Sequence, residues 1–248
     1  MNGRPALLRN LRRLSPLLFA CLLLGGCVYL RLLELRDQLA DFDRFFSIRS
    51  APGLTLICQQ PVLLVEDMGF FGLAPEWQTR LGVALRWHLR WIKDYAAPGE
   101  QPEDYEVTAD FMFVDGKLKS VHLPERVFTF VPKSLVLAAL RSLGHASVDK
   151  SRQSARAAIA MAKNSPLTRS DLLRFLGTPL EARHTGDILR LHYRYTMVAD
   201  VPSPGKIDLT FTLDATTESV AHVEVRMPHA VIELDWPKPA AAGTAPAP

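Results

Sequence analysis

The chain has 248 residues, of which 48% are hydrophobic and 22% charged, and its formal net charge is +3. A hydrophobic fraction of this size supports a folded core and excludes a chain that is disordered throughout. Residues 1–26 carry four arginines and no acidic residue, so removing them lowers the net charge to −1. This argues against a nucleic-acid-binding protein, which needs an excess of Lys and Arg.

The first 27 residues have the pattern of a bacterial lipoprotein signal. The arginines precede an apolar stretch at 16–26, which is shorter than the ~20 residues of a membrane-spanning helix. Residues 24–27, Leu-Gly-Gly-Cys, resemble the lipobox. The resemblance implies cleavage before Cys27 and attachment of fatty acids, palmitate among them, to that cysteine. Because Val28 rather than Asp follows, it also implies the periplasmic face of the outer membrane. The alternative is an uncleaved signal anchor.

The segment after Cys27 begins with a predicted helix. Residues 28–46 repeat their apolar side chains with a helical period. We expect this helix to pack on the core; the alternative, a helix lying on the bilayer, fits less well because the polar face mixes Arg with Asp and Glu. Cys58 is the remaining cysteine of the mature chain and lies in an apolar run, so we expect a buried, unreactive thiol.

An internal repeat organises the rest of the chain. A shift of 104 residues places 67–91 on 171–195 without a gap, with identity at eight of 25 positions, where ordinary composition gives about one or two. In each unit we expect a short helix, a strand (85–92 and 188–196), a Pro- and Gly-containing loop and a β-hairpin. Further helices are expected at 132–144 and 148–164. The predicted fold class is therefore α+β, with two duplicated units that each pack helices on a three-stranded antiparallel meander.

Residues 165–227 resemble a known family, the outer-membrane lipoprotein domain called BamE, SmpA or OmlA. Its helix-to-strand motif is matched by Thr168, Asp171, Leu176, Gly177 and Pro179, and "LHYRY" (191–195) fits its aromatic strand. The resemblance implies two helices on a three-stranded meander, as in each half of the β-lactamase inhibitor protein. It also implies a non-enzymatic role in outer-membrane assembly or maintenance.

These observations divide the chain into four parts. We expect a signal peptide at 1–26 and a first unit at 27–131, which includes the N-terminal helix and an inserted hairpin. A second unit follows at 132–235, and the Ala/Pro-rich tail at 236–248 is predicted to be disordered.

The strand at 85–91 raises the question of function. Its strict alternation predicts that Leu85, Trp87, Leu89 and Trp91 face the core, while Arg86, His88 and Arg90 face outward. The second copy should place Tyr193 and Tyr195 in the core and Arg190, His192 and Arg194 outside. Asp110, His122, Asp208 and His222 are expected on the same outer face.

Three interpretations of this face are open. In the first, the basic rows form cross-strand charge pairs with Asp110 and Asp208. In the second, they bind an acidic partner or lipid phosphate. In the third, two His and one Asp in each unit (His88, Asp110 and His122; His192, Asp208 and His222) form a metal or acid–base site, although an open sheet face encloses nothing. Charge pairing is our first interpretation and an acidic partner the second.

The sequence carries no HExxH, GxSxG, phosphate-binding Gly loop or CxxC motif. We therefore expect a non-enzymatic envelope lipoprotein with a structural or protein-binding role, anchored through Cys27 and bound to an envelope protein. No metal, cofactor, nucleic acid or small-molecule substrate is expected. The alternative is an inhibitor or accessory of an envelope enzyme, with an enzyme as the last option.

Overall fold

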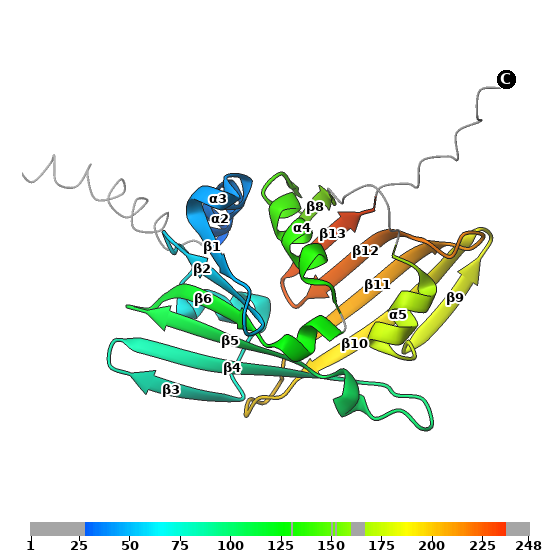
Figure 1. The fold of residues 1–248 in the computed structure, drawn as a ribbon, viewed down its shortest axis with the longest axis horizontal. Coiled ribbons are helices and arrows are strands. Elements are labelled where there is room, and N and C mark those ends of the chain that lie inside the picture. The colour runs from blue at the N-terminus through cyan, green and yellow to red at the C-terminus, as the bar shows by residue number, and fades with distance from the viewer. Residues whose placement is uncertain (1–27, 130, 150, 152, 160–166, 237–248) are drawn as a thin grey trace, which may run out of the picture.

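The computed structural model describes residues 28–129, 131–149, 151, 153–159 and 167–236 (Figure 1). The predicted signal peptide, Cys27 and nearly all of the Ala/Pro-rich tail lie outside these residues. Within the described part of the chain, no helix has the length and apolarity needed to cross a bilayer.

A single sheet of 13 strands dominates the described structure (Figure 1). Its order is β1-β2-β6-β5-β4-β10-β11-β12-β13-β8-β7, with β3 paired to β4 and β9 paired to β10. All neighbouring strands are antiparallel except β13 and β8. The strands are β1 (Phe46–Arg49), β2 (Leu54–Cys58), β3 (Trp77–Leu81), β4 (Ala84–Lys93), β5 (Val107–Val114), β6 (Lys117–Leu123), β7 (Ser147–Asp149), β8 (Ser154–Ala158), β9 (Glu181–Thr185), β10 (Ile188–Met197), β11 (Lys206–Asp214), β12 (Val220–Met227) and β13 (Ala230–Asp235).

Helices are short and few by comparison. Those described are the α-helices α2 (Val28–Ala40), α3 (Phe42–Phe45), α4 (Lys133–Leu143) and α5 (Arg169–Leu176), and the 3-10 helices η1 (Val65–Phe71), η2 (Pro102–Tyr105) and η3 (Glu125–Thr129). The start of α5 shows why it forms where the sequence predicts it. The Thr168 side chain accepts a hydrogen bond from the Asp171 N–H, and the Asp171 carboxylate accepts one from the Thr168 N–H, which satisfies two donors at the helix start.

The predicted fold of two helix-on-meander units is wrong. The meanders β4-β5-β6 and β10-β11-β12 exist, but β4 pairs with β10 and joins them into one sheet, which β1, β2, β13, β8 and β7 extend at its edges. The predicted helix at 148–164 is also wrong, because β7 and β8 occupy its first part. Its Ala- and Arg-rich sequence favours a helix locally, but main-chain pairing of β8 with β13 overrides that preference.

The two repeats are related by an approximate two-fold axis. Strands β4 and β10 begin and end 104 residues apart, as do β3 and β9. Where β4 meets β10, Ile92 lies opposite Thr196, which is its own counterpart in the repeat. Ala40 and Gly144 are also counterparts, and they touch so closely that a Cβ on Gly144 would lie 2.2 Å from the Ala40 backbone nitrogen. A contact between counterparts marks the position of a two-fold axis.

The two repeats share most of their elements in the same order, although α3, η2 and η3 of the first repeat have no counterpart among the described helices of the second. The helices α2 and α4, the hairpins β1-β2 and β7-β8, and the meanders occur in the same order in both repeats. In the first repeat β2 pairs directly with β6, whereas in the second β13 lies between β8 and β12. Strand β13 is therefore the element of the second repeat that has no counterpart in the described part of the first.

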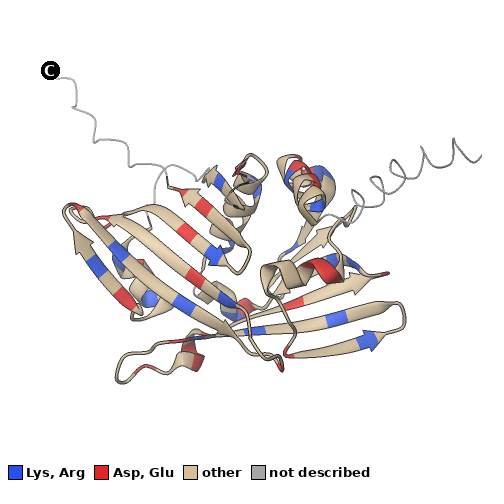
Figure 2. Ribbon diagram, turned by 180° about the vertical axis from the view of Figure 1, so that it is seen from behind, with Lys and Arg blue, Asp and Glu red and all other residues tan. Residues whose placement is uncertain are grey.

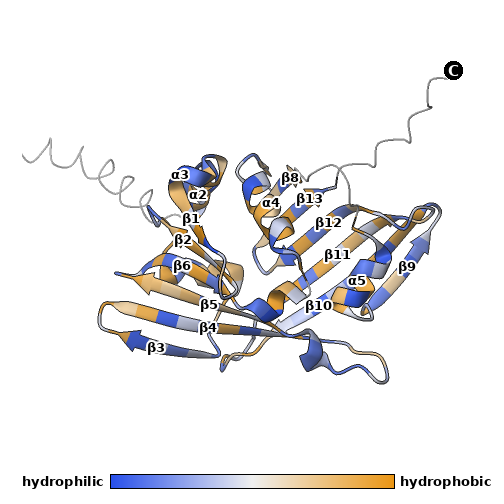
Figure 3. Ribbon diagram, viewed as in Figure 1, coloured by the Kyte–Doolittle hydropathy of each residue, from blue (hydrophilic) through white to orange (hydrophobic). Residues whose placement is uncertain are grey.

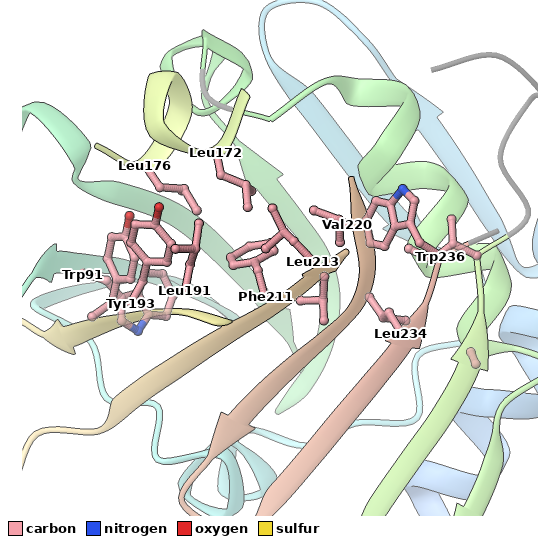
Figure 4. Close-up of a cluster of buried hydrophobic side chains, with 14 of the residues drawn as sticks. Trp91, Leu172, Leu176, Leu191, Tyr193, Phe211, Leu213, Val220, Leu234 and Trp236 are labelled. Carbon is pink, nitrogen blue, oxygen red and sulfur yellow. The ribbon is translucent and has the colours of Figure 1, made fainter. Parts of the chain in front are cut away.

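The main core belongs mostly to the second repeat and extends across the junction to Leu89 and Trp91 of β4. Side chains of β4, β10 and β11 pack beneath Leu172 and Leu176 of α5 (Figure 4). Apolar and polar positions are interspersed along the strands of the sheet (Figure 3). Burial confirms the predicted alternation along β4 and β10, because Leu89 and Tyr193 are 0% exposed and Trp91 and Tyr195 are also buried.

Two smaller clusters lie in the first repeat. One centres on Phe113 and Met68, and the other joins α2, α3, β1 and β2. Cys58 belongs to the second, so the prediction of a buried thiol is confirmed. Burial raises the pKa of the Cys58 thiol to about 11, against a smaller opposing effect of Lys119.

Candidate functional site

The outer face of the first repeat contains the predicted Arg-His-Arg row. Asp110 on β5 lies directly opposite His88 on β4. Arg86 Nη2 is 2.7 Å from Asp110 Oδ2, and His88 Nδ1 is 2.8 Å from Asp110 Oδ1. Burial raises the pKa of Asp110, but the hydrogen bonds from His88 and Arg86 outweigh it and leave the pKa below its ordinary value. The predicted cross-strand charge pair with Asp110 is confirmed.

Arg90 reaches different carboxylates. Its Nη2 is 3.0 Å from Glu76 Oε1, and its Nη1 is 3.3 Å from Glu106 Oε2. The Trp77 ring stacks on His88 at a centroid distance of 4.8 Å. Sequence reasoning missed Glu76 and Trp77 because β3 was not predicted. Glu106 was expected as the first residue of the strand at 106–114, but its pairing with Arg90 was not.

The second repeat pairs its charges in a similar way. Asp208 Oδ1 is 2.7 Å from both His192 Nε2 and Arg194 Nε. Burial again raises the pKa of this carboxyl, but the hydrogen bonds from Arg194 and His192 outweigh that effect and leave the pKa below its ordinary value. Arg190 is exposed and lies opposite Thr212 and Arg183 on the neighbouring strands. Viewed from behind, acidic and basic positions are interspersed over the sheet (Figure 2).

The histidines that would complete a metal or acid–base site have other partners. His122 Nδ1 lies 2.9 Å from Thr55 Oγ1, and His222 Nδ1 lies 2.9 Å from Asp235 Oδ1. The trio proposed for the second repeat is therefore not assembled around Asp208. Among the described residues, no group of three or more His, Cys, Asp or Glu side chains is arranged to hold a metal ion.

A buried lysine lies where the repeats join. Lys93 continues the inward-facing series of β4, its side chain is 1% exposed, and its Nζ lies 3.7 Å from Glu100 Oε2. The same Nζ lies 4.5 Å from the centre of the Tyr105 ring. Glu100 accepts hydrogen bonds from the Ala97 N–H and from the N–H and hydroxyl of Thr178. Burial lowers the pKa of Lys93, and Glu100 opposes that effect. The signal that could have identified this lysine is its position two residues after Trp91.

The hairpin of β3 and β4 carries exposed apolar side chains. Trp77 is 44% exposed, Leu81 59% and Val83 72%. Their counterparts in the second repeat are Glu181, Thr185 and Asp187, all polar. The second repeat instead exposes Leu180 and Ile188, at 38% and 41%, next to its strand β9 and turn.

An apolar groove of about 440 Å³ runs between α2 and the β13–β8 edge of the sheet. Its walls include Val28, Tyr29 and Leu33 of α2 on one side and Ala155 and Val231 on the other. A second apolar cavity, of about 320 Å³, lies between α4, α5 and the sheet. The volume of the groove falls within the ~300–1,000 Å³ range of ligand pockets.

These features differ in what they offer chemically. The outer face presents oppositely charged groups that pair with each other across strands, the β3–β4 hairpin presents apolar side chains to solvent, and the groove presents an apolar hollow.

Comparisons of the chain with known protein families, with characterised proteins and with solved structures find no match.

Proposed function

We propose that this chain is a lipid-anchored protein of the bacterial envelope, held by Cys27 on the periplasmic face of the outer membrane, that binds another envelope protein and does not catalyse a reaction. The anchor is supported by the lipobox-like sequence at 24–27. Val28, the residue after Cys27, already belongs to α2, so ordered structure lies directly beside the proposed anchor.

The exposed β3–β4 hairpin is the observation that carries the binding role. The β9–β10 hairpin has the same length and pairing but polar residues at the counterpart positions, so the hairpin does not need apolar side chains there to fold. Full burial of a large apolar side chain is worth ~1.5–3 kcal/mol, and Trp is enriched at the energetic centres of protein interfaces. Leu81, Val83 and the exposed part of Trp77, whose ring also stacks on His88, therefore offer apolar surface that a partner can bury.

The geometry of β3 also suits a protein partner. Among the described strands β3 pairs only with β4, so its second edge is open to a further strand. A partner strand on that edge would gain main-chain hydrogen bonds while the apolar side chains supply specificity. The basic rows are a weaker choice of interface, because Arg86, Arg90 and Arg194 already contact carboxylates.

The anchor is tested by Cys27→Ala. We expect the variant to leave the membrane fraction and to lose labelling by a fatty-acid analogue, while the wild-type protein retains both. Unchanged fractionation and labelling of the variant would refute the anchor.

The binding role is tested by exchanging residues between the two hairpins. A triple variant takes the counterpart residues of the second repeat: Trp77→Glu, Leu81→Thr and Val83→Asp. The matched control takes those of the first repeat: Leu180→Glu and Ile188→Ala. Proteins cross-linked in intact cells are then recovered from solubilised envelopes with wild type and each variant.

We expect a specific partner to be recovered with the wild type and with the control but lost from the triple variant, with circular dichroism showing that all three are folded. Equal recovery with the triple variant would show that this hairpin is not the binding surface.

A further inference from the structure

The apolar groove follows α2 from the point where the proposed anchor begins. Val28, Tyr29, Leu32 and Leu33 line it near the start of the helix, and Leu39 lines it near the end. At 1.5 Å per residue, Val28 to Leu39 covers roughly 17 Å. Near the end of α2, the contact between Ala40 and Gly144 brings α2 against α4. The groove is therefore an elongated hollow that starts one residue from Cys27.

The lining of the groove selects for hydrocarbon. Besides α2, its lining includes Phe70, Phe71, Val231 and Ile232, and the polar residues Gln153 and Ser154 also border it. Arg36 also borders it, but the Arg36 guanidinium hydrogen-bonds to Asp37, 2.6 Å away. A polar occupant would lose its hydrogen bonds to water here, whereas each buried methylene group gains about 0.8 kcal/mol.

The packing of α2 is incomplete in a way that matches this hollow. The sequence predicts that the apolar stripe of the N-terminal helix packs on the core, and Leu39 of α2 and Phe42 of α3 do so. Tyr29 and Leu33, nearer the anchor, are only half-buried and border the groove. The opposite wall is formed in part by β13, the strand without a counterpart in the other repeat.

We propose that one acyl chain of the lipid on Cys27 lies in this groove. The inference rests on the proposed lipid attachment. Consecutive Cα atoms lie ~3.8 Å apart, so a chain on Cys27 starts beside Val28, which lines the groove. Because it is tethered there, its effective concentration is far above that of a free lipid. The remaining two chains of a triacylated cysteine still anchor the protein, since two lipid chains suffice for stable attachment.

A tethered chain in the groove has a structural consequence. Lipid tails are about as apolar as leucine side chains. Moving the acyl chain from the bilayer into the groove therefore changes its hydrophobic free energy little. The occupied groove holds α2 and the β13–β8 edge together beside the membrane. It therefore fixes how the fold is oriented on its anchor.

The test uses the full-length protein in the cells that make it. Cells are fed a fatty acid that carries a diazirine, irradiated, and the purified protein is digested for mass spectrometry. We expect the acyl chain on Cys27 to be cross-linked to groove residues such as Leu33, Phe71 or Ile232. Ala155→Trp, which fills the groove, should abolish these cross-links while Cys27 stays acylated. Val201→Trp, on an exposed loop, should retain them.

Each other outcome has a separate meaning. Cross-links from Cys27 to membrane lipids alone would overturn the inference. Groove cross-links that persist in Cys27→Ala would identify a free lipid as the occupant and would also overturn it. An unacylated Cys27 in the wild type would instead overturn the proposed anchor. If circular dichroism shows that Ala155→Trp is unfolded, Ala155→Leu provides a smaller obstruction, and cross-links unchanged in that variant would refute the inference.

Discussion

Replacing Lys93 by Met tests whether the buried charge at the junction between the repeats stabilises the fold. Met is the residue at the counterpart position, 197, in the second repeat. Lys93 is almost fully buried and its Nζ is 3.7 Å from the nearest Glu100 oxygen, beyond normal hydrogen-bond length. Glu100 is 23% exposed and keeps three other hydrogen bonds, so removing the ammonium does not leave a buried carboxylate unsatisfied. Replacement of buried charges by well-packed apolar groups is often neutral or stabilising by 1–4 kcal/mol. We expect Lys93→Met to raise the free energy of unfolding by about 0–2 kcal/mol.

Removing the charge of Glu100 instead of that of Lys93 is expected to lower the free energy of unfolding. Glu100→Gln keeps the size of the side chain but leaves the Lys93 ammonium buried without a carboxylate. Removing one partner of a buried ion pair typically costs 3–5 kcal/mol. Because the Nζ–Oε2 distance is long and Glu100 is partly exposed, we expect the free energy of unfolding to fall by about 3 kcal/mol, the lower end of that range.

The pH dependence of unfolding separates the contribution of Lys93 from that of packing. The pKa of Lys93 is lowered by burial, so between this pKa and the ordinary value of ~10.4 the unfolded chain binds more protons than the folded one. The free energy of unfolding therefore rises with pH in that window. In urea unfolding in the same detergent, the free energy of unfolding of the wild type relative to Lys93→Met should rise between pH 7 and pH 9.5, because the opposing effect of Cys58 is present in both proteins. A loss of more than about 1 kcal/mol in Lys93→Met, or an unaffected Glu100→Gln, would refute the reasoning.

Three further results are expected. Asp110→Asn and Asp208→Asn should each lower stability by about 1–2 kcal/mol. Since the pKa values of these carboxyls are lowered in the folded state, their contribution is present above pH ~4 and is lost on acidification, so acid unfolding of the double variant should be less steep. Gly177→Ala should destabilise more than Gly186→Ala. Both glycines have positive φ, but a Cβ at 177 would lie 2.5 Å from a tyrosine ring whereas a Cβ at 186 meets nothing within 4 Å; thermal unfolding of both variants measures the difference. Cys58 should resist alkylation at pH 8 in the native protein and react after denaturation, because its pKa is about 11.

The outer face could be predicted from the sequence because alternation alone specifies which side chains share a face. Arg86 and His88 meet Asp110 as soon as β4 and β5 pair, and the Asp-Gly turn between β5 and β6 sets the neighbouring register. The pairing of β4 with β10 could not be found in this way. It is made by main-chain groups at residues 91–93 and 195–197, which carry no side-chain signature. Lys93 was missed because the predicted strand ended at residue 92, although one further step of the alternation from Trp91 places it on the inward face.

Differences between the two repeats indicate where the molecule acts beyond its own folding. Two units related by a two-fold axis need similar residues for packing, and they have them along β4 and β10, where the contact between Ile92 and Thr196 lies on the axis. They differ in the exposed residues of the β3–β4 hairpin and in the presence of β13. The first difference provides an apolar surface that the second hairpin folds without, and the second provides a wall of the groove beside Cys27. The hairpin does not need its apolar residues to fold, and we propose that they contact a partner protein. Strand β13 joins β8 to the sheet and also lines the groove in which we propose that a hydrocarbon chain lies.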